Sequence, residues 1–256
     1  MRGALTQMHV VFAVLLRETK TRFGDNQLGY LWAFLQQGLM IGMFAGFFSL
    51  FGRVAPPGMS MIAFLTTGMV PFWLFRETTQ RCMSAVDSNR GLLFYPQVRP
   101  LDLVIARAVL EAVTYLGVMT LFMGGLALYE GPPHIESLLR TFMGLGLASG
   151  FGASLGLVCC SISVFTPTFE RLFPSVLRIV FWFSAVFHPV ETLPKGMHDI
   201  IILNPVAHFI ELVRSGWFPG YDAHSADPSY VLGWILVLSF FGLSIERMAR
   251  RRLELT

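Results

Sequence analysis

Few residues of this sequence have the type and spacing that chemistry requires, and the first candidate is a serine. Ser154 lies in the segment 152–156, which matches the G-x-S-x-G pattern of a hydrolase nucleophile. That chemistry needs a sharp turn between a strand and a helix, whereas the surrounding run is long and apolar. Glycines four residues apart instead predict helix faces that a neighbouring helix can approach closely. The two pairs are Gly146 with Gly150 and Gly152 with Gly156. We favour packing, and a membrane-embedded hydrolase is the alternative.

Two histidine and glutamate pairs are the candidates for metal binding. Glu191 follows His188 by three residues, and Glu211 follows His208 with the same spacing. The two pairs together could converge on one metal ion. However, Pro189 disrupts the first pair, and no H-E-x-x-H motif is present. We predict no metal site and expect the second pair to anchor a re-entrant helix.

Two clusters of charge lie at the ends of apolar runs. Arg107 and Glu111 are one helical turn apart, and Arg76 precedes Glu77. A charge at the centre of a bilayer costs about 2.5–3.5 kcal/mol. We favour positions near the membrane interface, and the alternative is that these charges face a water-filled path. No series of buried acids indicates a proton relay.

Lysine and cysteine usage excludes further kinds of site. Neither lysine, Lys20 or Lys195, stands in the G-K-[ST] motif that cradles phosphate in a P-loop. The chain therefore cannot hydrolyse ATP in that way, and we expect it to hold no cofactor. The spacing of Cys82, Cys159 and Cys160 suits neither a metal nor a redox dithiol, so we predict that they pack in the interior.

The composition is that of an integral membrane protein. Of 256 residues, 54% are hydrophobic and 14% are charged, against about 25% charged in soluble domains. The charges gather in clusters between long runs that hold almost none. A net charge of +3 gives no overall basic field, so no nucleic-acid partner is expected. Membrane lipid is the expected solvent.

Six apolar runs approach the length of about 20 residues that a membrane-spanning helix needs. The runs are 26–52, 59–75, 103–129, 138–165, 172–187 and 230–245. Six spans place both termini on one side. Arginines are frequent on that side and sparse on the other, so the positive-inside rule makes the termini cytoplasmic. The N-terminus lacks the features of a cleaved secretory signal.

Three further segments complete a single predicted domain over 1–256. Segment 1–24 is amphipathic, with Val10, Val11, Val14 and Leu15 at helical spacing, and is predicted to lie along the inner membrane surface. Segment 85–100 fits a short amphipathic cytoplasmic helix. Segment 188–229 holds two apolar pieces divided by Asn204 and Pro205, each too short to span, which predicts re-entrant helices on the outer side.

Several motifs, in this order, resemble the permeases of type-2 ABC transporters. The sequence of 17–23 is RETKTRF, 28–33 is LGYLWA, 97–102 is QVRPLD and 106–111 is ARAVLE. Later come Asn204, Pro205, His208, Glu211 and Arg214, before Gly220 and Tyr221. The resemblance runs nearly end to end and is closest to Gram-negative capsular-polysaccharide exporters. One departure is Gln36 and Gln37, where relatives often have Glu-Pro, which removes an expected kink and a buried acid.

The resemblance implies a multi-pass inner-membrane transport subunit rather than an enzyme. Its implied partners are a second copy of the chain and two ATPase subunits that bind ATP and Mg. A periplasmic polysaccharide co-polymerase, an outer-membrane channel and an acidic, lipid-anchored polysaccharide or glycolipid substrate complete the implied set. The coupling helix that docks on the ATPase would contain Asp87, Asn89, Arg90, Leu92, Leu93, Phe94 and Tyr95.

Two sets of residues are predicted to serve the cargo. The substrate path is predicted to include Tyr30, Trp32, Trp73, Arg76 and Arg107, with aromatic rings stacking on sugars and arginines attracting acidic groups. Lipid alone also explains the aromatic residues, as an interfacial belt. The outer re-entrant region is predicted to use His188, Asn204, Pro205, His208 and Glu211.

Two other kinds of transport stay open as alternatives. The same architecture could export O-antigen, teichoic acid or a drug. An ion-coupled secondary transporter would usually show inverted repeats, and the two halves of this sequence show none that is convincing.

Overall fold

The computed structural model describes residues 2–23, 28–52, 55–56, 58–95, 97–131, 134–166 and 168–253, and these contain helices but no strand. The α-helices are α1 (Arg2–Phe23), α2 (Leu28–Leu50), α3 (Met61–Met83), α4 (Pro100–Glu130), α5 (Leu138–Phe165), α6 (Thr168–Trp182), α7 (Lys195–Ile201), α8 (Pro205–Trp217) and α9 (Pro228–Leu253). Two 3-10 helices, η1 (Asp87–Leu92) and η2 (Val190–Thr192), connect them.

Each of the six apolar runs contains a helix, but the helices differ in length and polarity. Three helices, α4, α5 and α9, are long and apolar enough to cross a membrane by length and composition. A fourth crossing is added if α7 and α8, bent by 100° at their junction, count as one broken span. The α3 helix continues past Phe75 to Met83 and so carries charged residues, whereas α6 ends at Trp182, before the predicted limit at 187.

The centre of the bundle is α5, which packs extensively on α3, α9 and α8. Two of its glycines admit α3, as the spacing predicted: a Cβ on Gly152 would lie 2.7 Å from the Phe75 carbonyl oxygen, and one on Gly156 would lie 2.5 Å from Cys82 Cβ. The other pair differs. A Cβ on Gly150 would lie 3.3 Å from an Ile235 carbon of α9, whereas one on Gly146 would meet nothing within 4 Å. Glycine is thus required at positions 152 and 156, where the backbone of α5 approaches α3 closely. Gly146 makes no such close approach.

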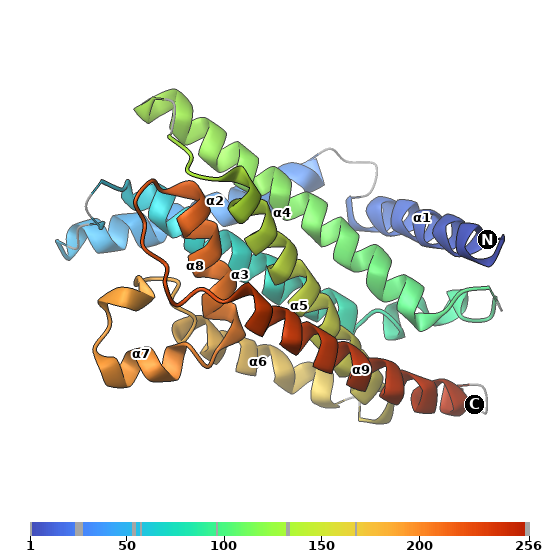
Figure 1. Cartoon of the computed structure of the whole chain (residues 1–256). Helices are drawn as coiled ribbons and strands as arrows, with labels where there is room; N and C mark the ends of the chain where they lie inside the picture. The colour runs from blue at the N-terminus through green and yellow to red at the C-terminus, as the bar shows by residue number, and fades with distance from the viewer. Residues whose placement is uncertain are drawn as a thin grey trace.

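The bundle has two unlike ends (Figure 1). The helix α1, the C-terminal part of α9 and the η1 segment lie toward one end, while α7 and α8 lie toward the other. Most of the arginines of the described residues lie at the first end, which we call the basic end. The second end, which we call the outer end after the prediction made for 188–229, contains few positive charges, among them Arg140, Lys195 and Arg214.

Candidate functional site

The first candidate site is a corner at the basic end, where α1, η1 and the start of α4 meet. Its centre is Arg107 on α4, which is buried. Its Nη2 lies 2.9 Å and its Nε 3.0 Å from Glu18 Oε1 of α1. Its Nη1 donates to the Arg81 carbonyl at 2.7 Å and to Ser84 Oγ at 3.0 Å. One guanidinium therefore binds α1, α4 and the end of α3 together.

Asn89 extends this network into η1. Its Nδ2 donates to Glu18 Oε1 at 2.7 Å and to the Ala85 carbonyl at 3.1 Å, while its Oδ1 accepts from Arg17 at 2.9 Å. Asn89 is buried, so these bonds form away from bulk water, where they are stronger. Asn89 therefore links η1 directly to α1 and, through Glu18, to Arg107 of α4.

Apolar packing lies beneath the polar network. Val14, from the predicted apolar stripe of α1, is 5% exposed and packs in a cluster with Val86 and Leu103. Leu92 and Leu93 are partly buried against the same cluster. On the opposite face of α1, Met8, Phe12 and Leu16 are exposed. Helix α1 therefore presents one apolar face to the protein and another to its surroundings.

The predicted helix over 85–100 is shorter in the structure. Only Asp87–Leu92 is helical, as a 3-10 helix, and Leu93–Tyr95 form turns before α4 begins at Pro100. Non-helical dihedral angles at Asn89 interrupt even this short helix. Phe94 and Tyr95 project outward with 88% and 63% exposure. The apolar surface available to a partner is thus Phe94 and Tyr95 rather than the two leucines.

Arg107 and Glu111, one turn apart on α4, each have a partner on another helix. Arg107 pairs with Glu18, whereas Glu111 Oε1 lies 3.8 Å from Arg81 Nε on α3. Glu18 was missed as a site residue because spacing along one helix cannot identify a partner about 90 residues away. Its position beside Arg17 in an amphipathic stretch was the signal available in the sequence.

The residues predicted for a substrate path are dispersed. Trp32 is 65% exposed on α2, whereas Trp73 is buried in the main core on α3. Arg76 is half-buried, and Arg107 belongs to the corner. The side chain of Tyr30 lies outside the described residues. A path role for these five residues stays a prediction.

A small polar pocket lies between α2, α3 and α4. It has a volume of about 90 Å³ and is lined by Gln36, Gln37, Glu77, Arg81, Thr114, Tyr115 and Val118. Gln37 Nε2 donates to Tyr115 Oη at 3.2 Å. With glutamines here, α2 is one continuous helix from Leu28 to Leu50, and the polar groups of three helices share one space.

The second candidate site is at the outer end and centres on Arg214 of α8, which is fully buried. Its Nη1 donates to the carbonyls of Ala185 at 2.8 Å and His188 at 3.3 Å and to Glu211 Oε1 at 3.0 Å. Its Nη2 donates to the Val186 carbonyl at 2.5 Å. Ala185 has a φ of 56°, a conformation that costs free energy for a residue with a side chain. Arg214 thus holds the strained turn after α6 in place.

The predicted outer residues lie around the same centre but bind separate partners. His208 Nδ1 accepts from the Asp227 amide at 3.0 Å, and its Nε2 lies 2.6 Å from the Ile202 carbonyl oxygen, to which it can donate. Tyr221 donates to both carboxylate oxygens of Glu211, at 3.0 and 2.8 Å. These contacts tie α8 to the segments that precede and follow it, and a re-entrant role for this pair stays a prediction.

Asn204 and Pro205 begin α8 in the manner their types predict. Asn204 is the N-cap residue and accepts from the Val206 amide at 3.0 Å, and Pro205 occupies the first helical turn. The Asn204 amide also donates to Ser184 Oγ at 3.0 Å. The junction of α7 and α8 is thereby tied to the turn that Arg214 binds.

Nearby, the exposed residues of the outer loops form a weaker link. Glu191 accepts from the Ser225 amide at 2.9 Å and from its Oγ at 2.7 Å. Partial burial opposes ionisation, but these hydrogen bonds prevail and hold the pKa of Glu191 below its usual value. His188, whose carbonyl binds Arg214, is itself exposed on this surface.

Comparison with known proteins identifies the family. The model of the ABC-2 type transporter family matches residues 9–218. The polysialic acid transport protein KpsM of Escherichia coli is 31% identical over 247 residues, which are 96% of this chain and 95% of that protein. The chain belongs to the ABC-2 transporter family. The capsule polysaccharide export inner-membrane protein CtrC of Neisseria meningitidis is 27% identical over 96% of this chain and 92% of that protein.

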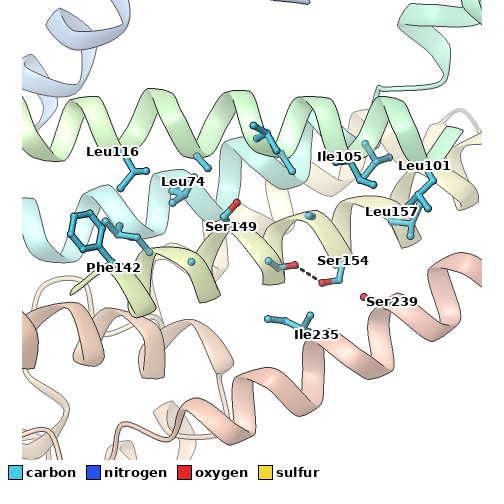
Figure 2. Close-up of a pocket in the computed structure, with 18 residues that line it drawn as sticks. Leu74, Leu101, Ile105, Leu116, Phe142, Ser149, Ser154, Leu157, Ile235 and Ser239 are labelled. Carbon is cyan, nitrogen blue, oxygen red and sulfur yellow. Dashed lines mark hydrogen bonds between the residues drawn. The ribbon is translucent and has the colours of Figure 1, made fainter. Parts of the chain in front are cut away.

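Membership of the ABC-2 family agrees with the state of the remaining candidate residues. Ser154 lies within α5, and its hydroxyl donates to the Gly150 carbonyl one turn earlier (Figure 2). It does not stand on a strand-to-helix turn, so nothing in its surroundings indicates a hydrolase. Within the described part of the chain, no three His, Cys, Asp or Glu residues group as metal ligands would.

Arg214 is the residue of this ABC-2 chain whose importance the sequence least disclosed. The sequence places it in the motif that contains Asn204, Pro205, His208 and Glu211. Its i, i+3 relation to Glu211 was the available signal. That relation gives no indication of the three carbonyl partners on the turn after α6.

Proposed function

We propose that this chain is the permease subunit of an ATP-driven exporter that moves capsular polysaccharide across the bacterial inner membrane. The carrying observation is its similarity, over nearly the whole of both chains, to proteins named for polysialic acid transport and capsule polysaccharide export. The cargo we infer is an acidic polysaccharide, because the first of these relatives is named for an acidic polymer. We further propose that this polymer is lipid-anchored, as the resemblance to capsular-polysaccharide exporters implies.

The topology we propose has six spans with both termini in the cytoplasm. It is supported by the helices within all six apolar runs and by the gathering of arginines at the end that holds α1 and the end of α9. We further propose that α1 lies in the inner membrane interface. The exposed Met8, Phe12 and Leu16, spaced to share one face, suit the acyl boundary there.

The proposed transporter contains two copies of this chain. The support is an apolar surface, formed by α2 and α6, that the chain itself leaves exposed. These helices are neighbours, since the Phe44 and Phe181 ring centroids are 6.3 Å apart. The exposed residues are Trp32, Leu35, Leu39, Met43, Phe47 and Leu50 on α2 and Leu172, Val176, Ile179 and Trp182 on α6. The exposed faces of α2 and α6 suit contact with the same faces of a second copy. Where the faces of the two copies separate, they would leave a polymer path that includes Trp32.

Energy would come from two ATPase subunits, which would bind the ATP and Mg. We propose that they dock on the turn that carries Phe94 and Tyr95, beside Asp87 and Arg90, whose exposed ion pair measures 2.8 Å. The stroke would pass through Asn89 to Glu18 and Arg107, and so reach α1 and α4 together. At the outer end, segment 188–229 would face a periplasmic co-polymerase and, through it, an outer-membrane channel.

A second cargo has its own support. The O-antigen export permease RfbA of Klebsiella pneumoniae is 23% identical over 243 residues, 92% of this chain. O-antigen export by the same architecture is therefore the competing function.

Complementation separates the two cargoes. We expect the chain, expressed with its ATPase partner, to restore surface capsule in a host that lacks its own capsule permease. A host that lacks its O-antigen permease should stay without O-antigen. Restoration of O-antigen but not capsule would reverse the assignment, and restoration without any ATPase would refute an ABC mechanism.

A further inference from the structure

A groove runs along the outward face of α5, and the proposed export function assigns it no role. Its volume is about 490 Å³; α5 forms its floor, and α4 and α9 form its walls (Figure 2). These are the three helices that are each long and apolar enough to cross a membrane. Ile105, Val109 and Phe142 line the groove and are 41%, 42% and 55% exposed. The groove therefore opens where lipid is the solvent.

Small residues on one face of α5 make the floor. They are Gly146, Ser149, Gly150 and Ala153, whose spacing places them on one side of a helix. The space beside Gly152 and Gly156 is occupied by α3, but a methyl group added at Gly146 would meet no atom within 4 Å. At Gly146 the small side chain therefore leaves open space, whereas Gly150 lies close to Ile235 of α9, at the wall of the groove.

The dimensions of the groove identify what fits. Its lining extends from Leu101 to Leu116 on α4 and from Phe142 to Leu157 on α5, and each stretch is about 22 Å long at 1.5 Å per residue. Spread over that length, the volume gives a mean cross-section on the order of 20 Å². A helix about 10–12 Å wide cannot enter a space of this cross-section and could only lie across its mouth. One extended hydrocarbon chain, about 4–5 Å wide from carbon contact distances, fits.

The chemistry of the groove agrees with its shape. None of its lining residues is charged, and the hydroxyl of Ser154 already donates to the Gly150 carbonyl. The end at Leu101 lies in the first turn of α4, two residues after the exposed Arg99. On α9, exposed Arg247 follows the lining residue Ser239 by two turns toward the same basic end. An apolar groove with cations at its cytoplasmic mouth suits a lipid with a negative headgroup.

We propose that this groove binds one acyl chain of an anionic membrane phospholipid, with the headgroup beside Arg99 and Arg247. The bound acyl chain fills the space that the small residues of α5 leave open between α4 and α9. The site does not depend on which polymer is exported, and none of the exposed α2 and α6 residues lines it.

Photolabelling tests the site on the full chain. The chain is placed in phosphatidylglycerol vesicles doped with a phosphatidylglycerol that carries a diazirine on its acyl chain, and the labelled peptides are identified. We expect label concentrated in 101–116 and 142–157. Gly146→Leu fills the floor and should lower that labelling several-fold. Gly124→Leu is the matched control, because Gly124 is an exposed glycine of α4 outside the groove with nothing within 4 Å.

Several outcomes would overturn the proposal. Labelling spread evenly over all exposed apolar helix faces, or unchanged by Gly146→Leu, would show general solvation only. Efficient cross-linking of two Ser149→Cys chains would show that a second copy of the chain occupies the groove. Cross-linking to another polypeptide would show that a partner helix occupies it. If Gly146→Leu does not fold, Ser149→Val fills less space and should lower labelling by a smaller factor.

Discussion

The basic corner and the outer end are each organised by one arginine, but the two arginines join different things. Arg214 binds three backbone carbonyls and Glu211, is fully buried, and lies 4.0 Å from the centre of the Phe64 ring. Its partners belong to α8, the adjoining turn and α3. Arg107 instead joins α4 to α1 through Glu18 and reaches η1 through Asn89. The first arrangement is a brace within a packed region, and the second is a joint between separate elements.

The difference in surroundings follows the same division. A Cβ on Gly68 would lie 2.6 Å from Arg214 Nη2, so the space around the brace is closed. At the joint, the Glu18 side chain is 16% exposed, and Phe94 and Tyr95, which follow η1 in the chain, are exposed. Protein interiors transmit strain because they are dense, but a moving part needs a boundary with few neighbours. We therefore expect the brace to determine stability and the joint to determine coupling.

Replacing Arg214 should produce the largest effect. Arg214→Ala leaves Glu211 and three carbonyls buried without their donor, and losses of about 3–5 kcal/mol follow from breaking buried pairs in this way. Arg214→Lys should rescue little, because one ammonium group cannot reproduce the forked geometry. Thermal unfolding in detergent and the yield of folded protein measure the effect.

Arg140→Ala is the matched control for the brace. Arg140 lies at the same end but is exposed, so its loss should change stability by less than about 0.5 kcal/mol. A lysine variant at 214 that unfolds at the wild-type temperature would contradict the role we give to the carbonyl contacts.

Weakening the joint should have a smaller effect on stability and a clear effect on coupling. Glu18→Gln removes the charge that Arg107 and Asn89 share, and charged hydrogen bonds contribute about 1.5–3 kcal/mol. We expect the ATPase subunit still to co-purify while polymer exported per ATP hydrolysed falls. Lys20→Gln, an exposed change on the same helix, should leave this ratio unchanged. A normal ratio in Glu18→Gln would show that the network does not transmit motion.

The exposed pair beside the joint should matter for binding and not for folding. Combined Phe94→Ala and Tyr95→Ala changes should leave the unfolding temperature unaltered and weaken capture of the ATPase subunit about tenfold, or about 1.4 kcal/mol. Leu92→Asp should destabilise the chain itself, because Leu92 packs in the corner cluster. Equal ATPase capture by the double variant and the wild type would show that the ATPase docks on another surface.

The comparison also separates what the sequence could predict from what it could not. Apolar runs predicted the helices, Asn204 and Pro205 predicted the break between α7 and α8, and Gly152 and Gly156 predicted contact with a neighbour, because each pattern is local. The corner and the brace depend on contacts between distant segments. Glu18 and Arg107 are such a case, and so are Arg214 and the carbonyls of 185, 186 and 188, since backbone acceptors have no sequence signature.

The segment 85–100 is a case in which a local pattern gave a wrong length for a helix. Its composition fits an amphipathic helix, but only Asp87–Leu92 is helical, because the buried bonds of Asn89 to Glu18 and Ala85 fix non-helical angles there. Tertiary contacts thus override a local preference. Of the four apolar residues predicted for coupling, Leu92 and Leu93 are partly buried and Phe94 and Tyr95 are exposed.

The smallest expected effect belongs to the periphery of the outer end, where Glu191 binds Ser225. The hydrogen bonds hold the pKa of Glu191 below its usual value, so their contribution is present above the unfolded-state pKa and is lost as pH falls through the folded-state pKa. The carboxylate is largely exposed, and we expect at most a few tenths of a kcal/mol. Glu191→Gln should therefore unfold slightly below wild type at neutral pH and together with it in acid. Glu136→Gln, at another exposed acid, should match wild type at both pH values, and a Glu191→Gln difference that persists in acid would indicate a role other than accepting these bonds.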